Sequence, residues 1–436
     1  MKRKMAMLLS WMLVLTMLAA CASGNNNEGT DAGKSNTGGN EGSGEVVNLT
    51  MWGGVPAESG PQAVVDVWNA ENPNIQVEYV RYVNDDDGNL KLDTALLTGQ
   101  DADLFVNYSI PRVEKRIEMG VALDLSTFED YNIDEKMGSS AEGWKIDGKY
   151  YGVPTKKNVF FVALNKDALD EAGLEIPTDW TWDEMRDYAK KLTKEGRYGL
   201  VQHTEPFVDP IDSVMVKEGY TKENGESNLN HPLVVQWMET LQAMMSEDKS
   251  TPPLGEQLTT KMPVDTMFLK GEAAMLNIGE WLIRSSNDME ANPRDFKIAF
   301  APVPKLSEEV DITRGGLGDY VSVNAKSGHT KEAWEFLKWY ADGGMAPMAA
   351  GGRLPASKDA DLEAATKSLL GDHADTYDEE SLKRILFEDQ SEHFVRNVSQ
   401  QLMDVRQEEY EKFFLGAQSA EEAAQNMADR HTSLLK

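Results

Sequence analysis

The residue types that most often hold metal ions are thinly spread along this sequence. The six histidines are scattered, and no pair has the His-x-x-x-His spacing of a zinc site on a helix. The acidic run Asp85-Asp86-Asp87-Gly88 suggests a calcium loop, but Val83 occupies the position of the first ligand. We therefore predict no metal site and no cofactor, and we interpret the acidic run as a polar loop.

The only cysteine, Cys21, follows a short hydrophobic segment. Lys2-Arg3-Lys4 precedes an apolar stretch from Met5 to Leu18, which is shorter than the roughly 20 residues of a membrane-spanning helix. This pattern is typical of a secretory signal, predicted over residues 1–20. Leu18-Ala19-Ala20-Cys21 resembles the lipobox of bacterial lipoproteins, which implies that Cys21 is diacylated and becomes the first mature residue. An ordinary signal peptide with an incidental cysteine is the alternative.

The segment after Cys21 has the composition of a tether. Residues 22–45 consist almost entirely of Gly, Asn, Ser, Thr, Ala, Glu and Asp, which cannot form a hydrophobic core. A flexible chain of this length spans roughly 27 Å. Two acyl chains anchor a protein stably where one would not. We expect residues 21–45 to connect a globular body to the outer face of the cytoplasmic membrane.

The length and charge of the body limit its class. Residues 46–436 are too many for one hydrophobic core, so two domains are expected. The formal charge of −30, which becomes more negative once the signal is removed, argues against binding of nucleic acid or of anionic lipid by the body. With Cys21 acylated, no cysteine is left to form a disulfide, so packing must stabilise the fold.

Hydrophobic periodicity predicts an α/β fold. Strands are expected at 46–52, 75–80 and 102–106, with helices between them, and this alternation is typical of a parallel sheet. Further strands are predicted at 159–164, 198–201, 273–278, 297–301 and 319–323, and helices at 166–172, 182–192, 234–245 and 333–340. Thr181 and Glu184 have the spacing of a capping box. Residues 358–436 are predicted to be mainly helical.

Several short segments of the sequence form a set. In chain order they are Tyr151-Gly152-Val153-Pro154, Asn165-Lys166-Asp167-Ala168-Leu169, Ala172-Gly173-Leu174, Trp180-Thr181-Trp182-Asp183-Glu184, Phe268-Leu269-Lys270-Gly271-Glu272-Ala273-Ala274-Met275, Gly279-Glu280-Trp281, Ala301-Pro302-Val303-Pro304, Gly315-Gly316 and Leu354-Pro355-Ala356. Together they resemble the extracellular solute-binding proteins of bacterial ABC importers, in the family of maltose- and multiple-sugar-binding proteins. Leu164 departs from the tyrosine usual in that family, a difference that we expect to be structural.

The resemblance implies a two-lobed, periplasmic-binding-protein-like clamp of type II. Each lobe would hold a mainly parallel sheet flanked by helices, and the chain would cross between the lobes several times. Lobe 1 would contain residues 46–157 and 317–352, and lobe 2 residues 158–316 and 353–436. Ligands of α/β sheets bind beyond the carboxyl ends of the strands.

The same resemblance indicates candidate ligand contacts. A sugar presents apolar ring faces, which aromatic side chains cover, and hydroxyl groups, which carboxylates, amides and arginine bind. Trp281 matches the position at which relatives stack an aromatic ring on the sugar. Glu205 and Phe207 resemble a Glu-Pro-aromatic turn that contacts sugar in those relatives. Asn107 and Tyr108 follow a predicted strand, where the family commonly places binding residues.

Further candidates lie near the predicted crossings. Trp52 ends the first strand and serves either as a contact or as a wall of the site. Asp319 and Tyr320 follow the glycine pair and face either the ligand or the hinge. Glu280 and Arg353 bind the ligand or form an ion pair, on the surface or between the lobes.

Three functions remain open. The leading hypothesis is a monomeric, non-catalytic protein that delivers a carbohydrate, expected to be an oligosaccharide, to the permease of an ABC importer. The second is a lipid-anchored glycoside hydrolase, which would need two carboxylates across the cleft, for example Glu205 and Glu280. The third is a surface sensor or a binding protein of the same fold for a non-sugar solute.

Overall fold

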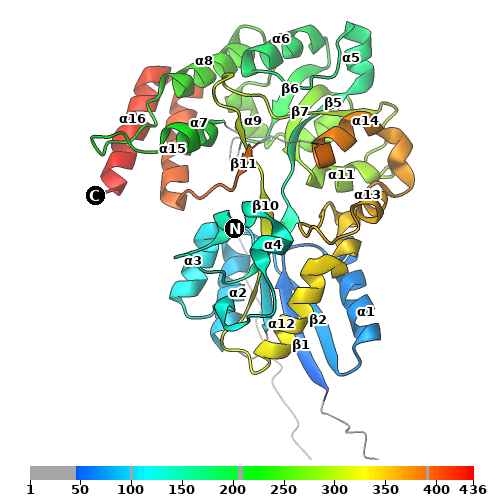
Figure 1. Ribbon diagram of the computed structural model, residues 1–436. Helices are drawn as coiled ribbons and strands as arrows, with labels where there is room; N and C mark the ends of the chain where they lie inside the picture. The colour runs from blue at the N-terminus through cyan, green and yellow to red at the C-terminus, as the bar shows by residue number, and fades with distance from the viewer. Residues whose placement is uncertain (1–45, 99–101, 205–209, 389–391) are drawn as a thin grey trace, which may run out of the picture. The chain divides into compact units, whose positions relative to one another are not determined.

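The computed structural model describes residues 46–98, 102–204, 210–388 and 392–436 (Figure 1). The chain divides into a unit of residues 1–44 and a compact unit of residues 45–436. The predicted signal, Cys21 and the tether up to residue 44 belong to the first unit and lie outside the described residues, as do Glu205 and Phe207.

Two sheets organise the second unit. The first sheet has the strand order β2-β1-β3-β10-β4, and the second sheet has the order β6-β7-β5-β8. The strands of the first sheet are β1 (Val47–Gly53), β2 (Ile75–Arg81), β3 (Leu104–Asn107), β4 (Val153–Lys157) and β10 (Leu317–Val323). Those of the second are β5 (Phe160–Asn165), β6 (Tyr198–Gln202), β7 (Ala273–Gly279) and β8 (Ile298–Ala301). The short strands β9 (Ile312–Arg314) and β11 (Glu392–Phe394) pair in parallel with each other.

Each sheet contains one reversed strand. β1 is parallel to β2 and β3, whereas β10 is antiparallel to β3 and β4. In the second sheet β6 and β7 are parallel, and β5 is antiparallel to β7 and β8. β5 follows β4 after two residues, so it enters the second sheet at the edge where β7 ends and must run against it. The α/β class expected from the sequence is confirmed. The strands of each sheet run in one direction apart from β5 and β10, and because each of these has two neighbours, both sheets are mixed.

Apolar residues alternate between the two faces of each sheet, because successive strand residues point to opposite sides. In β5, Phe161 and Ala163 belong to one buried cluster, while Val162 and Leu164 belong to another. Helices α1 and α12 pack on one face of the first sheet and α2 on the other. Helices α6, α8, α15 and α16 share one face of the second sheet, and α10, α11, α13 and α14 share the opposite face.

Every helix predicted from the sequence is present. Those associated with the first sheet are α1 (Pro61–Glu71), α2 (Asp86–Thr98), α3 (Ile110–Glu118), α4 (Ile133–Met137) and α12 (Thr330–Trp339). The others are α5 (Lys166–Ala172), α6 (Trp182–Leu192), α7 (Ile211–Glu218), α8 (Pro232–Ser246), α9 (Leu254–Thr260), α10 (Val264–Leu269), α11 (Trp281–Asn287), α13 (Leu362–Leu370), α14 (Glu379–Lys383), α15 (Gln400–Phe414) and α16 (Ala420–Leu434). Helices α3, α4, α7, α9, α10 and α11 were not predicted. In the part of the chain that the structure describes, no helix is both long and apolar enough to cross a membrane.

Local signals explain where two helices begin. The predicted capping box is present, with Thr181 Oγ1 accepting the amide of Glu184 and the Glu184 carboxylate accepting the amide of Thr181. The acidic run is not a loop, because Asp86 already begins α2. The carboxylate of Asp85 accepts the amide of Gly88 at 2.8 Å and so satisfies an otherwise free donor of the first turn.

Three connections between the sheets lie side by side. The first is Asn158-Val159, between β4 and β5. The second is Gly315-Gly316, just before β10, and Gly316 O accepts the amide of Asn158 at 2.9 Å. The third passes through Leu354, whose carbonyl accepts the amide of Lys157 at 2.9 Å. These hydrogen bonds hold together segments that are far apart in sequence.

A buried carboxylate in α15 makes the stability depend on pH. Burial alone would raise the pKa of Glu409, but hydrogen bonds from Lys412, Gln418 and Arg430 outweigh it and lower the pKa to about 2, from 4.5. Because the folded-state pKa is the lower one, the contribution of Glu409 is complete above pH 4.5 and is lost as the pH falls toward 2.

We expect Glu409→Gln to lower the free energy of unfolding by about 2 kcal/mol at pH 7 and by almost nothing near pH 2. Urea unfolding of both proteins between pH 2 and 7 measures this difference. Glu408→Gln, an exposed neighbour that also contacts Arg430, is the control and should have little effect. A Glu409→Gln difference that stays constant with pH would contradict the prediction.

Candidate functional site

The carboxyl ends of three neighbouring strands, β1, β2 and β3, form one edge of the first sheet. The amide of Gly54, just beyond β1, donates to Tyr108 Oη at 2.7 Å. Tyr79 Oη donates to the carbonyl of Val55 at 2.8 Å. The loops that follow β1 and β3 are therefore fixed to each other, and Tyr108 lies partly buried at this edge.

Asn107 lies just inside this edge and is fully buried. Its amide nitrogen donates to Tyr320 O at 3.1 Å and to Ser322 Oγ at 3.0 Å, and its carbonyl accepts Arg116 Nη1 at 2.7 Å. Arg116 also binds Asp93 Oδ1 at 2.9 Å. These contacts make Asn107 a positioning residue for the end of β3 and for the adjacent Tyr108.

Two other candidates from the sequence point into the protein interior. Trp52 is 6 % exposed and packs in the cluster that contains Leu92 and Phe105. Tyr320 is fully buried, with its ring stacked on Trp144 at a centroid distance of 4.8 Å. Both side chains support the walls of the edge, and their predicted contact with a ligand stays a prediction.

Asp319 and Arg353 form an ion pair beside this edge. Arg353 Nε lies 3.4 Å from Asp319 Oδ2, and the Arg353 side chain is 15 % exposed. Asp319 has a φ of 46°, which turns its side chain out of the regular strand pattern. Burial disfavours the charged guanidinium of Arg353, but the charges of Asp319, Tyr108 and Glu280 outweigh that effect and raise its pKa.

Trp281 begins α11, and Glu280 alone separates it from the end of β7. It is partly buried and packs edge-to-face on Phe160, with ring centroids 5.7 Å apart. A Cβ atom at Gly279 would lie 2.2 Å from the Trp281 ring, so only glycine permits this placement. The residue is not fully buried, and a stacking surface requires an accessible ring face.

Glu280 connects the two sheets. Its carboxylate forms an ion pair with Lys156 of β4 and accepts the amide of Val159 at 3.1 Å. The side chains of Glu280 and Lys156 are only 1 % and 6 % exposed. The sequence left two roles open for Glu280, ligand binding and an ion pair. The structure shows Glu280 in an internal ion pair between the sheets.

The last connection brings these groups together. A Cβ atom at Gly352 would lie 3.2 Å from Glu280 O and 3.3 Å from the Cα atom of Trp281, so the backbone before Arg353 runs against the start of α11. Arg353 thus lies between Trp281 and Asp319. Tyr108, Asp319, Arg353 and Trp281 form the set that we call the junction site.

A narrow pocket in the first sheet opens next to Asp319 and Tyr108. Its lining is mostly apolar and includes Val55, Tyr79 and Met348. It has room for about one water molecule, so a ring-sized ligand cannot enter it. A ligand of the junction site must therefore lie over the sheet edge rather than within the lobe. Within the described residues, no group of His, Cys, Asp and Glu side chains could hold a metal ion.

Sequence reasoning missed several residues near the junction site. Lys156 lies two residues beyond the matched segment Tyr151-Gly152-Val153-Pro154, and nothing in the sequence indicates its pairing with Glu280, 124 positions away. Tyr79 in β2 was assigned only to a strand. A charged residue in an otherwise buried strand, as Lys156 is, was the one available signal.

Comparison with known proteins identifies the family. Residues 53–343 match the sequence profile described as bacterial extracellular solute-binding protein. The chain belongs to this family. A putative binding protein of Brucella abortus is 25 % identical over 293 residues, covering 64 % of this chain and 68 % of the relative. The arabinooligosaccharide-binding protein of Halalkalibacterium halodurans is 28 % identical over 172 residues, covering 37 % and 38 %.

A solved structure supports the fold of this solute-binding protein. The ABC substrate-binding protein of Listeria monocytogenes, in complex with cycloalternan, superposes with a TM-score of 0.72 and 23 % identity, covering 89 % of this chain and 99 % of the other. The two-lobed clamp predicted from the sequence is therefore confirmed.

Proposed function

We propose that this solute-binding protein captures a carbohydrate, expected to be an oligosaccharide, between its lobes and delivers it to the permease of an ABC importer. The observation that carries the proposal is the partly accessible Trp281 beside the Arg353–Asp319 pair. An aromatic face next to a carboxylate and a guanidinium provides a surface for a sugar ring and partners for its hydroxyl groups. Two proteins of like sequence or fold are named for arabinooligosaccharide binding or hold cycloalternan.

Binding would change the angle between the lobes. The connection between β4 and β5 is only two residues long, so rotation would be concentrated at Asn158-Val159 and the two adjacent connections. A ligand that contacts Trp281 on one side and Tyr108 on the other favours the closed state by its differential affinity. Micromolar binding corresponds to about −8 kcal/mol, enough to shift such an equilibrium.

The glycoside hydrolase alternative lacks support from Glu280. A hydrolase needs two carboxylates that reach the bond to be cleaved. Glu280 is fully buried and paired with Lys156, so it serves the connection between the sheets. We therefore assign a non-catalytic role to the protein.

The proposal includes a lipid anchor and a monomeric state. Diacylation of Cys21 would hold the protein at the outer face of the cytoplasmic membrane, with residues 22–45 as the tether. Incorporation of labelled palmitate into the wild-type chain but not into Cys21→Ala would support the anchor, and equal labelling would contradict it.

The test of carbohydrate binding is a thermal-shift screen against neutral and acidic oligosaccharides, polyols and peptides. A ligand at one hundred times its dissociation constant adds about 2.7 kcal/mol of stability. We expect a shift with one class of saccharide and a roughly tenfold or greater loss of affinity in Trp281→Ala. Trp281→Phe, which keeps an aromatic face, is the matched control and should retain most of the affinity. A shift with peptides alone would contradict the carbohydrate assignment.

A further inference from the structure

Arg284 is a guanidinium without a counter-ion next to the junction site. It lies on α11 three residues after Trp281, so the two residues are neighbours on the surface of that helix. Its side chain is partly buried, yet within the described part of the chain it has no carboxylate at ion-pair distance and no hydrogen-bond partner. By contrast, the buried Arg116 and Arg406 are paired with aspartates.

The charges of two further arginines act on Arg284. Burial lowers the pKa of Arg284, and the positive charges of Arg353 and Arg81 lower it further. Arg353 adjoins α11 through Gly352, as described above. Arg81 is exposed at the carboxyl end of β2, the edge that also carries the loop to Tyr108.

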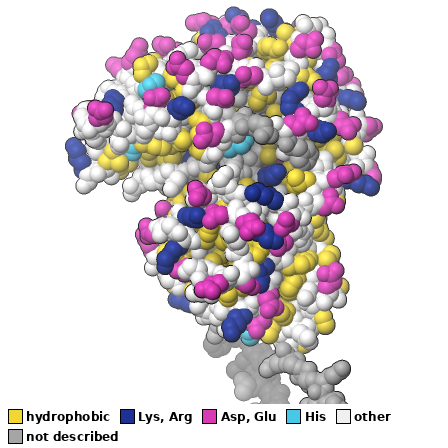
Figure 2. All heavy atoms as spheres, in the orientation of Figure 1, with side chains coloured by type: hydrophobic (Ala, Val, Ile, Leu, Met, Phe, Trp, Pro, Cys, Tyr) yellow, Lys and Arg dark blue, Asp and Glu magenta, His cyan; other side chains and the backbone are white. Residues whose placement is uncertain are grey.

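The charged side chains around the junction site do not cancel one another. Lys156 and Glu280 neutralise each other, and Asp319 neutralises Arg353, which leaves Arg284 and Arg81 in excess. This local excess of positive charge occurs in a chain with a formal charge of −30, whose acidic side chains are spread over the surface in Figure 2. A partly desolvated cation without a partner costs free energy, which an anionic ligand would offset by charge-assisted hydrogen bonds.

We propose that the ligand is an acidic saccharide, and that its carboxylate or sulfate group binds between Arg284, Arg81 and Arg353 while a sugar ring covers Trp281. This inference rests on the proposed carbohydrate function and specifies its substrate class. Guanidinium groups suit such an anion because their planar donors match its oxygens in pairs.

The experiment is calorimetric titration of the full-length chain, purified in detergent, with three trisaccharides. Trigalacturonate carries carboxylates, its methyl ester is neutral, and a sulfated galactose trisaccharide carries sulfates. We expect one of the acidic ligands to bind about tenfold or more tightly than the ester, with an affinity that falls as salt is added. The comparison between the two acids identifies the anionic group.

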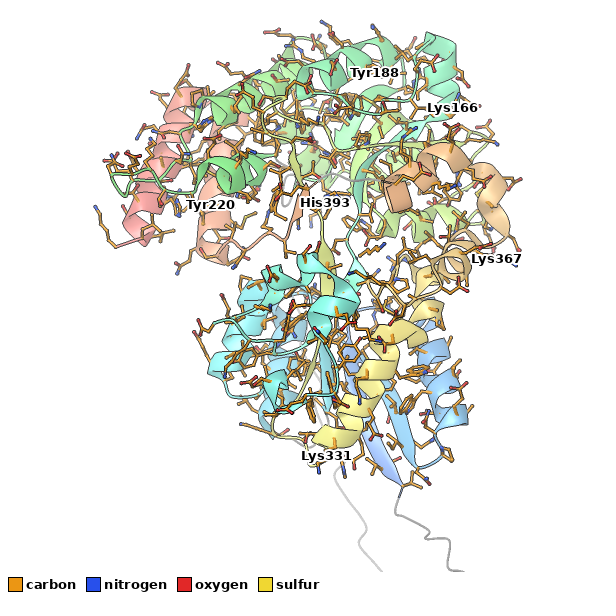
Figure 3. The ribbon with its side chains drawn as sticks, in the orientation of Figure 1. Lys166, Tyr188, Tyr220, Lys331, Lys367 and His393 are labelled. Carbon is orange, nitrogen blue, oxygen red and sulfur yellow. The ribbon has the colours of Figure 1, made fainter. Side chains whose placement is uncertain are left out.

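Variants separate the local effect from general charge. Arg284→Gln and Arg81→Gln should each weaken binding of the acid about tenfold while leaving binding of the neutral ester unchanged. Arg284→Lys should recover part of the loss. Because Arg81 is exposed, its variant tests the proposal even if Arg284→Gln is poorly folded. Lys331→Gln, which removes one exposed charge far from α11 (Figure 3), is the control and should change neither affinity.

The outcomes distinguish this inference from the proposed function. Equal binding of acid and ester, or binding of a neutral saccharide without any effect of Arg284→Gln, overturns the acidic assignment and keeps the carbohydrate function. Failure of all three trisaccharides overturns the acidic assignment, and failure of every saccharide in the thermal-shift screen overturns the carbohydrate function as well.

Discussion

Replacing Glu280 by glutamine is expected to lower the free energy of unfolding by about 3–5 kcal/mol. The substitution leaves the ammonium group of Lys156 inside the protein, 6 % exposed, without an opposite charge. A buried charge that loses its partner keeps its full desolvation penalty. Urea unfolding monitored by tryptophan fluorescence measures the change.

Two controls define the origin of this effect. Lys166 and Asp170 form an exposed pair on α5, where Lys166 is labelled in Figure 3, so Asp170→Asn should cost less than about 0.5 kcal/mol. Joint replacement, Lys156→Met with Glu280→Leu, should recover most of the lost stability, because both desolvation penalties disappear. A cost under about 1 kcal/mol for Glu280→Gln, or a double variant less stable than the single one, would contradict the prediction that desolvation of this ion pair dominates its energetics.

Replacing Arg116 by methionine is expected to cost about 3–5 kcal/mol and to weaken ligand binding as well. Arg116 is 1 % exposed and donates to Asp93, Asn107 and Asn89 at 2.7–2.9 Å. Methionine leaves these buried acceptors without that donor, and the end of β3 next to Tyr108 loses its support. Unfolding curves measure the stability, and titration with the ligand from the screen measures the affinity.

The matched control for Arg116 lies on the same helix. Arg112 pairs with Asp86, which is almost fully exposed, so Arg112→Met should cost less than about 1 kcal/mol and leave affinity unchanged. Similar costs for the two variants would show that the Arg116 network contributes no more than a surface contact.

Local patterns were sufficient to predict most elements. The helix beginning after Thr181 was found because its capping box involves residues only three positions apart. Helix α12 was found because its apolar residues repeat on one face. It ends at Trp339, and a short π-helical turn, Tyr340–Gly344, carries the chain through the glycine pair at which the helix was predicted to stop. The short strand β11 was missed, because three residues carry too little periodicity to distinguish a strand from the surrounding helices.

Local sequence patterns do not determine which strands pair or in which direction they run. Nothing within residues 317–323 indicates that β10 lies between β3 and β4, or that it runs against both. The same limit applies to the site. The Gly279-Glu280-Trp281 motif indicated Trp281 as a ligand contact, which stays a prediction, but the ion pair of Glu280 depends on a residue 124 positions earlier. The charge excess at Arg284 depends on three segments that meet only in the folded chain.

The position of β10 also dictates when the first sheet can be completed. Residues 317–323 fill the gap between β3 and β4, which end more than 150 positions earlier in the sequence. At about 5–20 residues per second, a ribosome needs roughly ten seconds or more to make the intervening chain. During that interval the edges of β3 and β4 that β10 later joins have no partner strand. The first sheet therefore cannot be completed until residue 323 has been made.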